Sequence, residues 1–392
     1  KWTEAVAKIN DTLYATLEEA FAAAGDNDTI TALKDCAGNG IQVPQGKFTT
    51  GLTIDFGGFT YTMDGAMVGS TGYETQAFQL LKDNKITFKN GTIYSEKALM
   101  LVQNYSDLTL EGMTLTLNNA NYTSAYTLSN NNGNIVIKDT KINANPAGGF
   151  AFDVCRYSSY PEVHVTVTGS SVINGNIEVS ASGSDAKNGF SLMLEGGTFS
   201  GKIVLDASAA AAIDATPEKA WVKRDKTKAE VDAPEGYTWV DLENNIQLLT
   251  KLVTVTFDAD NGSEPTSVAI AKGQTVTKPE DPTKENAIFD GWFAAEAEEA
   301  FDFDTPITAD ITLTAKWTEA VAKINDTLYA TLEEAFAAAV DGDTITVLKD
   351  CAGNGIKVPE GKYTTGLTVD FDGHTYDFSG KGVGAAHTGD NG

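Results

Sequence analysis

The sequence has few of the residues that build metal sites, disulfides and nucleic-acid interfaces. Its 392 residues include three cysteines, three histidines and only 28 lysines and arginines against 54 acidic residues, a net charge of −26. So acidic a chain repels phosphate backbones and anionic membranes, because binding them relies on Lys and Arg to neutralise charge. We therefore expect no nucleic-acid partner. We also expect no membrane insertion, because no apolar run approaches the roughly 18 residues of a spanning helix.

The three cysteines form no readable metal-binding pattern. Cys36 and Cys351 are equivalent positions of a long repeat, so one repeat unit holds two cysteines, Cys36 and Cys155. None has CxxC spacing, and the histidines are too few to complete a zinc site. We interpret the cysteines as small buried thiols, with a Cys36–Cys155 disulfide as the alternative. We expect no metal and no cofactor.

A long internal repeat organises the chain. Residues 1–24 recur identically at 316–339, an offset of 315, and 52 of the first 61 residues match at this offset. Such self-similarity indicates a modular protein that covers one unit and the opening of the next. No signal peptide or anchor is recognisable, so we expect a fragment of a longer secreted protein whose targeting segments lie elsewhere.

Within the unit, a shorter motif recurs at intervals of 22–32 residues. It reads apolar–x–apolar, then a polar or Gly-containing corner, then an apolar eighth residue. The period-2 alternation predicts a strand with one buried face. The copies are IDFGGFTY (54–61), ITFKNGTI (86–93), LTLEGMTL (108–115), IVIKDTKI (135–142), VTVTGSSV (165–172) and LMLEGGTF (192–199).

This spacing indicates a coiled solenoid, because strands of hairpin sandwiches usually recur every 8–12 residues or so. Stacked coils superimpose equivalent residues, which predicts two interior ladders. The first consists of Ile86, Leu108, Ile135, Val165 and Leu192. The second consists of Phe88, Leu110, Ile137, Val167 and Leu194.

The ends of a solenoid must be covered to protect their strand edges. Residues 16–19 read as a capping box, and an apolar stripe at helical spacing follows them. We predict an amphipathic capping helix over 16–24, with its exact copy at 331–339. The strand motif fades after Leu205, so residues 206–250 are interpreted as a C-terminal cap and connector.

The segment 253–317 carries VTVTFDADNG (253–262), FDGWF (289–293), FDFDTPI (301–307) and DITLTAKW (310–317). In these motifs it resembles the Listeria–Bacteroides repeat, also called the internalin-type B-repeat. The usual Gly-Tyr is replaced by Asn286-Ala287. The resemblance implies a β-grasp-like module that serves as a spacer or adhesion segment on bacterial surfaces. It would make Lys1-Trp2 the tail of a preceding B-repeat.

Residues 12–205, with TLEEA (16–20) and NGTI (90–93), are similar to the pectin-lyase-like right-handed β-helix superfamily, in particular to adhesin-like members of gut Gram-positive bacteria. The expected fold is mainly β: a right-handed parallel β-helix with an N-terminal capping helix, plus the β-grasp-like module. The expected domains are 1–11, a B-repeat tail and linker; 12–205, the β-helix; 206–250, the cap and connector; 251–317, the B-repeat; and 318–392, the truncated start of a second β-helix. We expect the last to be the least stable part.

Two groups of residues are candidates for chemistry. Five carboxylates lie at or near the motif corners, where we interpret them as solvated corner residues, with a catalytic pair flanking a glycosidic bond as the alternative: Asp107, Glu111, Asp139, Asp153 and Glu195. The unusual stretch 150–164 is interpreted as a surface loop with stacked aromatic rings, with a glycan-binding patch as the alternative, because aromatic faces and a guanidinium can bind a sugar. Its candidate ligand-binding residues are Tyr122, Tyr126, Arg156, Tyr157, Tyr160 and His164. A further alternative is catalysis by Arg156 as a base.

The segment 258–262 contains three acidic or amide side chains and could suggest a calcium loop. It lacks the bidentate Glu of such loops, and Asn261-Gly262 is a strong turn signal, so we predict a hairpin turn.

These features favour a structural or adhesive segment of a large bacterial cell-surface protein, extracellular and attached to the cell wall through segments outside this sequence. We expect no enzymatic activity. The expected partners are neighbouring repeats, glycans or host surface proteins, the last gripped through an exposed strand edge. The alternative is a carbohydrate-binding or polysaccharide-cleaving module, since a β-helix alone does not specify function.

Overall fold

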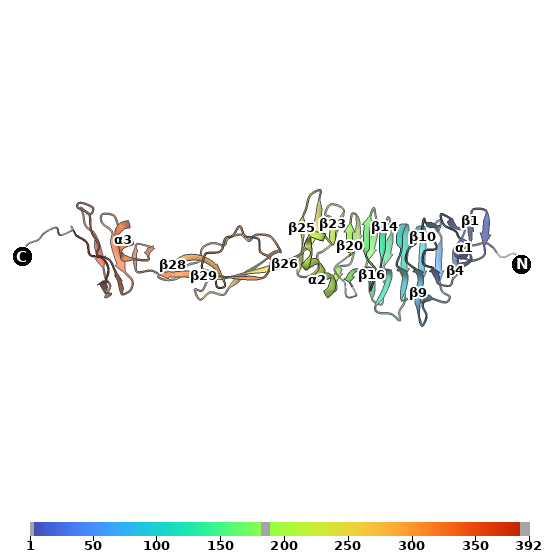
Figure 1. Cartoon of the computed structure of the whole chain (residues 1–392), viewed down its shortest axis with the longest axis horizontal. Helices are drawn as coiled ribbons and strands as arrows, with labels where there is room; N and C mark the ends of the chain where they lie inside the picture. Colours follow the sequence, from blue (N-terminus) through green and yellow to red (C-terminus); the bar gives the residue numbers. More distant parts are fainter. Residues whose placement is uncertain (1–3, 182–188, 385–392) are drawn as a thin grey trace, which may run out of the picture. The chain divides into compact units, whose positions relative to one another are not determined.

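The computed structural model describes residues 4–181 and 189–384 and divides into two compact units, Lys1–Lys251 and Leu252–Gly392. The first unit is a parallel β-solenoid whose turns stack on one another along the chain (Figure 1). The mainly β fold class predicted from the sequence is therefore confirmed.

Each turn of the solenoid adds strands to up to three parallel ladders, here called faces 1, 2 and 3. Face 1 contains β3 (Thr29–Ala32), β6 (Leu52–Asp55), the first halves of β10 (Lys85–Ser95) and β12 (Asp107–Leu117), β14 (Gly133–Lys138), β17 (Val163–Thr168), β20 (Phe190–Leu194) and β23 (Val222–Asp225). Face 2 contains β4 (Cys36–Gly38), β7 (Thr60–Met63), the second halves of β10 and β12, β15 (Lys141–Asn143), β18 (Val172–Asn174), β21 (Gly197–Phe199) and β24 (Ala229–Glu230). Face 3 contains β5 (Ile41–Val43), β9 (Tyr73–Leu80), β11 (Met100–Asn104), β13 (Ala125–Asn130), β16 (Gly149–Arg156), β19 (Asn176–Ala181) and β22 (Ile203–Leu205). A short strand, β8 (Val68–Ser70), pairs antiparallel with β9.

The corner of the eight-residue motif separates face 1 from face 2. The corner residues Asn90, Gly112, Asp139 and Gly169 all have positive φ, between 50° and 66°. Gly, Asn and Asp tolerate this left-handed conformation best, which explains why the motif requires these residues between its two apolar parts.

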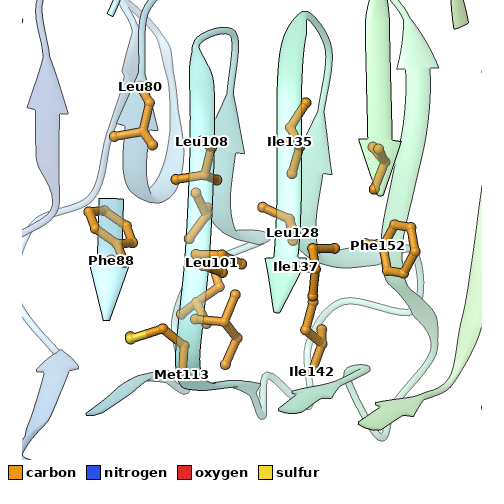
Figure 2. Close-up of a cluster of buried hydrophobic side chains, with 14 of the residues drawn as sticks. Leu80, Phe88, Leu101, Leu108, Met113, Leu128, Ile135, Ile137, Ile142 and Phe152 are labelled. Carbon is orange, nitrogen blue, oxygen red and sulfur yellow. The ribbon is translucent and has the colours of Figure 1, made fainter. Parts of the chain in front are cut away.

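Both predicted interior ladders are confirmed. Ile86, Leu108, Ile135, Val165 and Leu192 are successive register partners, and so are Phe88, Leu110, Ile137, Val167 and Leu194. All ten side chains are at most 1 % exposed. Figure 2 shows Leu108 and Ile135 on neighbouring coils, with Leu128 and Phe152 of face 3 in the same cluster of buried side chains. Coil stacking thus builds one continuous core.

The N-terminal end of the solenoid is covered by a hairpin and a helix. β1 (Ala7–Ile9) pairs antiparallel with both β2 (Thr12–Tyr14) and β3, and so closes the edge of face 1. The helix α1 (Leu17–Ala23) begins where predicted, with Thr16 Oγ1 accepting the Glu19 N–H at 3.1 Å. The Glu19 carboxylate accepts the N–H of Ala15 and not that of Thr16, the donor that the predicted capping box requires.

The coils continue beyond Leu205, the residue at which the sequence places their end. The helix α2 (Ala207–Ala215) follows β22, and a 3₁₀ turn (Pro217–Lys219) leads into β23, which pairs parallel with β20. The antiparallel strands β25 (Tyr237–Asp241) and β26 (Ile246–Asp258) then cover this coil, since β26 pairs with β23. The last parallel edge is therefore closed by antiparallel structure, as at the N-terminal end.

The second unit begins with a four-stranded sheet in the order β27–β26–β29–β28. It consists of β26, β27 (Thr266–Ala271), β28 (Ala287–Ala294) and β29 (Ile311–Glu319), and only the β26–β29 pair is parallel. Val255, Trp292 and Leu313 form its small core. The repeat of the N-terminal cap follows, with β30 (Ala322–Ile324), β31 (Thr327–Tyr329), α3 (Leu332–Ala338), β32 (Thr344–Val347), β33 (Cys351–Gly353), β34 (Thr368–Asp370) and β35 (Tyr376–Phe378). Here the predicted capping box is complete, because Glu334 accepts the N–H of Thr331.

Candidate functional site

The six residues considered for a glycan-binding patch lie on two faces of the solenoid and in two different connections, with Tyr122 in the connection from β12 to β13. Tyr126 lies on β13 of face 3, and His164 on β17 of face 1. Tyr157 and Tyr160 lie in the connection from β16 to β17, which joins those faces. The structure therefore divides the predicted set into separate surroundings.

Tyr157 and Tyr160 gather around a third tyrosine, Tyr105, which sequence reasoning missed. The Tyr105 ring centre lies 4.8 Å from that of Tyr160 and 6.5 Å from that of Tyr157. Tyr105 is 8 % exposed, and burial raises the pKa of its hydroxyl. Tyr157 is 45 % exposed, so this cluster presents one open aromatic ring to solvent.

The other three candidates have different surroundings. Tyr122 is partly buried and packs against the solenoid core. Arg156 ends β16 and is only 6 % exposed, which limits the reach of its guanidinium to a surface ligand. His164 lies between Ser191, whose Oγ is 2.7 Å from Nδ1, and Glu162, whose carboxylate is 3.3 Å from Nε2.

Tyr126 belongs to a group on the outer side of face 3. Its ring stacks on Phe150 with centres 5.4 Å apart, and its hydroxyl donates to the Glu178 carboxylate at 3.0 Å. Glu178 is the register partner of Asp153 on the neighbouring coil. Phe152 and Val154 on either side of Asp153 belong to the core, so Asp153 points away from it. Two carboxyl groups and a tyrosine from three successive coils therefore lie close together.

The environment of Asp153 favours its neutral form. The side chain is 4 % exposed, and it accepts hydrogen bonds from the Asn130 N–H and, at 3.0 Å, from the Ser129 hydroxyl. Burial raises the pKa of Asp153 to about 8, against these hydrogen bonds and with a further contribution from Glu178. Partial burial also raises the pKa of Glu178. Carboxyl groups of perturbed pKa on one surface are a feature of functional sites and also of structural networks.

Three of the other candidate carboxylates stabilise corners or pair with a lysine on the next coil. Asp107 accepts the Asn134 N–H at 2.9 Å, and Asp139 accepts the N–H and hydroxyl of Ser170 at 2.8 and 2.9 Å. Glu111 pairs with Lys138 at 2.7 Å. These contacts fit the interpretation of the carboxylates as corner residues.

The segment 258–262 is a turn between β26 and β27, as predicted. Asp258 accepts the N–H of Asp260 at 3.0 Å, and Gly262 has a φ of 90°. Within the described residues, no three His, Cys, Asp or Glu side chains are grouped so as to hold a metal ion. Cys36 and Cys155 lie on faces 2 and 3, and no disulfide links them.

Comparison with known proteins identifies one segment. Residues 254–316 match the model of the Listeria-Bacteroides repeat domain. A putative Gly-rich membrane protein of Evansella cellulosilytica is 41% identical over 66 residues, which are 16% of this chain and 8% of that protein. A putative membrane protein of the same organism is 37% identical over 82 residues, 19% of this chain and 12% of that protein. The chain thus spans only a small part of these relatives.

No solved structure matches the chain. None of the helices in residues 4–181 and 189–384 has the length and apolar character needed to cross a bilayer. The chain therefore joins a parallel β-solenoid to a segment that matches the Listeria-Bacteroides repeat domain.

Proposed function

We propose that this chain is a structural and adhesive repeat segment of a large secreted bacterial cell-surface protein, which acts as a stalk or adhesin and not as an enzyme. The observation that carries the proposal is that the cap of the solenoid is built twice, with the same lysine and aspartate contacts. A stalk needs repeated segments, whereas an enzyme needs one good site.

A lysine stabilises the end of the capping helix in both copies. The Lys47 ammonium donates to the carbonyls of Phe21 and Ala22 at 2.7 and 3.1 Å. Its counterpart Lys362 donates to the equivalent carbonyls of α3 at 2.8 and 3.1 Å. A cation at these carbonyls compensates the negative end of the helix dipole.

An aspartate fixes the turn after each capping helix in the same way. The Asp26 carboxylate accepts the N–H groups of Thr50 and Gly51 at 3.0 Å. Asp341 accepts the equivalent two N–H groups at 2.8 and 2.9 Å. Each module therefore carries its own capping lysine and aspartate, as a stacked or tandem architecture requires.

Outer side chains also connect one coil to the next. Along face 1, Asp55, Lys89, Glu111 and Lys138 are successive register partners with alternating charge. Lys89 lies 3.5 Å from Asp55, and Lys138 lies 2.7 Å from Glu111. Exposed pairs contribute little to stability individually. Their alternation reduces the repulsion between carboxylates on successive coils of this acidic chain.

Single-molecule stretching tests the structural part of the proposal. A stalk should unfold in discrete steps, with the solenoid as the largest extension, and should refold with the same contour length after relaxation. A smooth extension without a force barrier would contradict a load-resisting role. Binding to immobilised glycans and host surface proteins tests the adhesive part, and no binding to either class would leave only the stalk.

One observation favours a second candidate function, a carbohydrate-binding or -cleaving module. It is the group of Tyr126, Asp153 and Glu178 on the outer side of face 3, where a carboxyl pair lies beside an aromatic ring. Titration of oligosaccharides against the wild type and Tyr126→Ala tests it. Saturable binding that this variant loses supports the module. Equal behaviour of the two proteins contradicts it.

A further inference from the structure

The connection between the B-repeat sheet and the cap that follows it is two residues long, and both of its backbone N–H groups are hydrogen-bonded. β29 ends at Glu319 and β30 begins at Ala322, so only Ala320 and Val321 lie between them. The Ala320 N–H donates to the Asn286 carbonyl of the B-repeat at 2.8 Å. The Val321 N–H donates to Tyr329 of the cap, also at 2.8 Å. A linker with both N–H groups bonded in this way has little freedom to bend.

Side chains close the same joint. Strand β31 of the cap hairpin packs against strand β28 of the B-repeat. Ala320 is 1 % exposed, and Leu328 on β31 is partly buried. The hollow beside the joint is lined from both sides, by Asn286 and Asp290 of the B-repeat and by Leu348 of the cap.

The first copy of the cap shows the same surface uncovered. Residues 1–24 and 316–339 are identical, so local sequence cannot explain a difference in burial between them. Leu13, the counterpart of Leu328, is 63 % exposed, and Ala5, the counterpart of Ala320, is partly exposed. Lys8 is likewise exposed where its counterpart is partly buried. All three residues are more exposed in the first copy, Lys8 and Leu13 within the hairpin and Ala5 just before it.

We propose that the hairpin surface formed by Ala5, Lys8 and Leu13 is a docking surface for a second copy of the B-repeat, residues 252–317, joined directly before it. B-repeat and following solenoid then form one rigid body. We identify the docking partner from the second copy of the cap, where the identical surface contacts the B-repeat of this chain. This inference goes beyond the proposed function, since it holds whether or not the solenoid binds a ligand.

Amide hydrogen exchange in two matched variants of the whole chain tests the existing joint. Leu328→Asp should speed exchange of the Ala320 N–H roughly tenfold, because it places a charge in a partly apolar contact. The Val321 N–H, which bonds within the cap, should stay within about twofold and reports that the cap remains folded. Leu13→Asp makes the same change in the identical sequence of the first cap, where no B-repeat covers the hairpin. It should leave the exchange rates of both amides unchanged. Unchanged exchange at Ala320 in Leu328→Asp would overturn the proposal.

Extension of the chain tests the uncovered surface directly. A copy of residues 252–315 placed before Lys1 restores the full B-repeat sequence there. The Ala5 N–H should then exchange roughly tenfold more slowly than in the present chain, and Leu13→Asp should abolish that protection. Equal exchange of the Ala5 N–H with and without the extension contradicts a docking surface.

Discussion

Arg224 occupies the ladder position of Leu194 on the last coil of the solenoid: the two are register partners on β23 and β20. The next layer on that coil is formed by the antiparallel strands β25 and β26 and not by another parallel coil. The Arg224 guanidinium lies 4.7 Å from the centre of the Trp239 ring, and its Nε donates to Gln247 at 2.8 Å. An arginine thus ends an apolar ladder by stacking on the cap.

Replacement of Arg224 tests its role in joining coil and cap. Arg224→Met keeps the apolar stem but loses the hydrogen bonds to Gln247 and to the carbonyl of Val231. We expect a loss of about 1–3 kcal/mol in the free energy of unfolding of the solenoid, measured by chemical denaturation. Lys223→Met, on the outer side of the same strand, is the control and should change stability by less than about 0.5 kcal/mol. Equal stability of both variants would contradict the assigned role.

The same arginine explains where sequence reasoning about the fold stopped. The ladders from Ile86 to Leu194 were predictable, because every copy of the motif places apolar residues two apart before a polar corner. In the last coil Val222 follows the pattern, but Arg224 replaces its second apolar residue. Arg224 is accommodated there because its guanidinium stacks on the ring of Trp239. This tertiary contact cannot be inferred from the local periodicity of the sequence.

Removal of one ladder residue should show how strongly coil stacking stabilises the solenoid. Ile137 is fully buried in a central coil. Ile137→Ala is expected to cost about 2–5 kcal/mol, because neighbouring coils on both sides prevent collapse of the cavity. Lys138→Ala removes an exposed ion pair on the same strand and should cost less than about 1 kcal/mol. A cost below 1 kcal/mol for Ile137→Ala in urea denaturation would count against the ladder.

Matched strands of the two repeat copies should differ in stability. β34 is the last strand of its sheet, whereas its counterpart β6 is paired on both sides. Phe371 is 40 % exposed, and its counterpart Phe56 is 1 % exposed. Amides of Thr368–Asp370 should therefore exchange faster than those of Thr53–Asp55, by on the order of a hundredfold or more. Similar protection in both strands would refute the expectation that the second copy is the least stable part.

The buried carboxyl of Asp153 should make stability depend on pH. Because its pKa of about 8 in the folded chain exceeds the unfolded value, its contribution is fully present below about pH 4 and is lost as the pH rises to about 8. Asp153→Asn mimics the neutral form. The difference in Tm between this variant and the wild type should therefore grow in favour of the variant from about pH 5 to pH 8. Glu111→Gln, which removes an exposed carboxylate, is the control. A difference that does not vary with pH would show that Asp153 titrates normally.

The candidate site was only partly predictable for a reason specific to solenoids. Tyr126 and Tyr157 stand out in the sequence because they lie in or near an unusual excursion. Their partners come from other coils. Glu178 follows Tyr126 by 52 residues, and Tyr105 precedes Tyr157 by 52 residues. Coil lengths vary between 22 and 32 residues, so register, which decides such contacts, cannot be read from spacing alone. His164 was misleading, because it already lies within β17 on face 1, whereas Tyr126 lies on face 3.

The most direct test of the central claim is release of reducing ends from plant, mucin and bacterial polysaccharides incubated with the whole chain, with Asp153→Asn assayed in parallel. A structural and adhesive segment predicts no release above the level of the variant on any substrate. Turnover by the wild type that is lost in Asp153→Asn would contradict this account and identify face 3 as an active site.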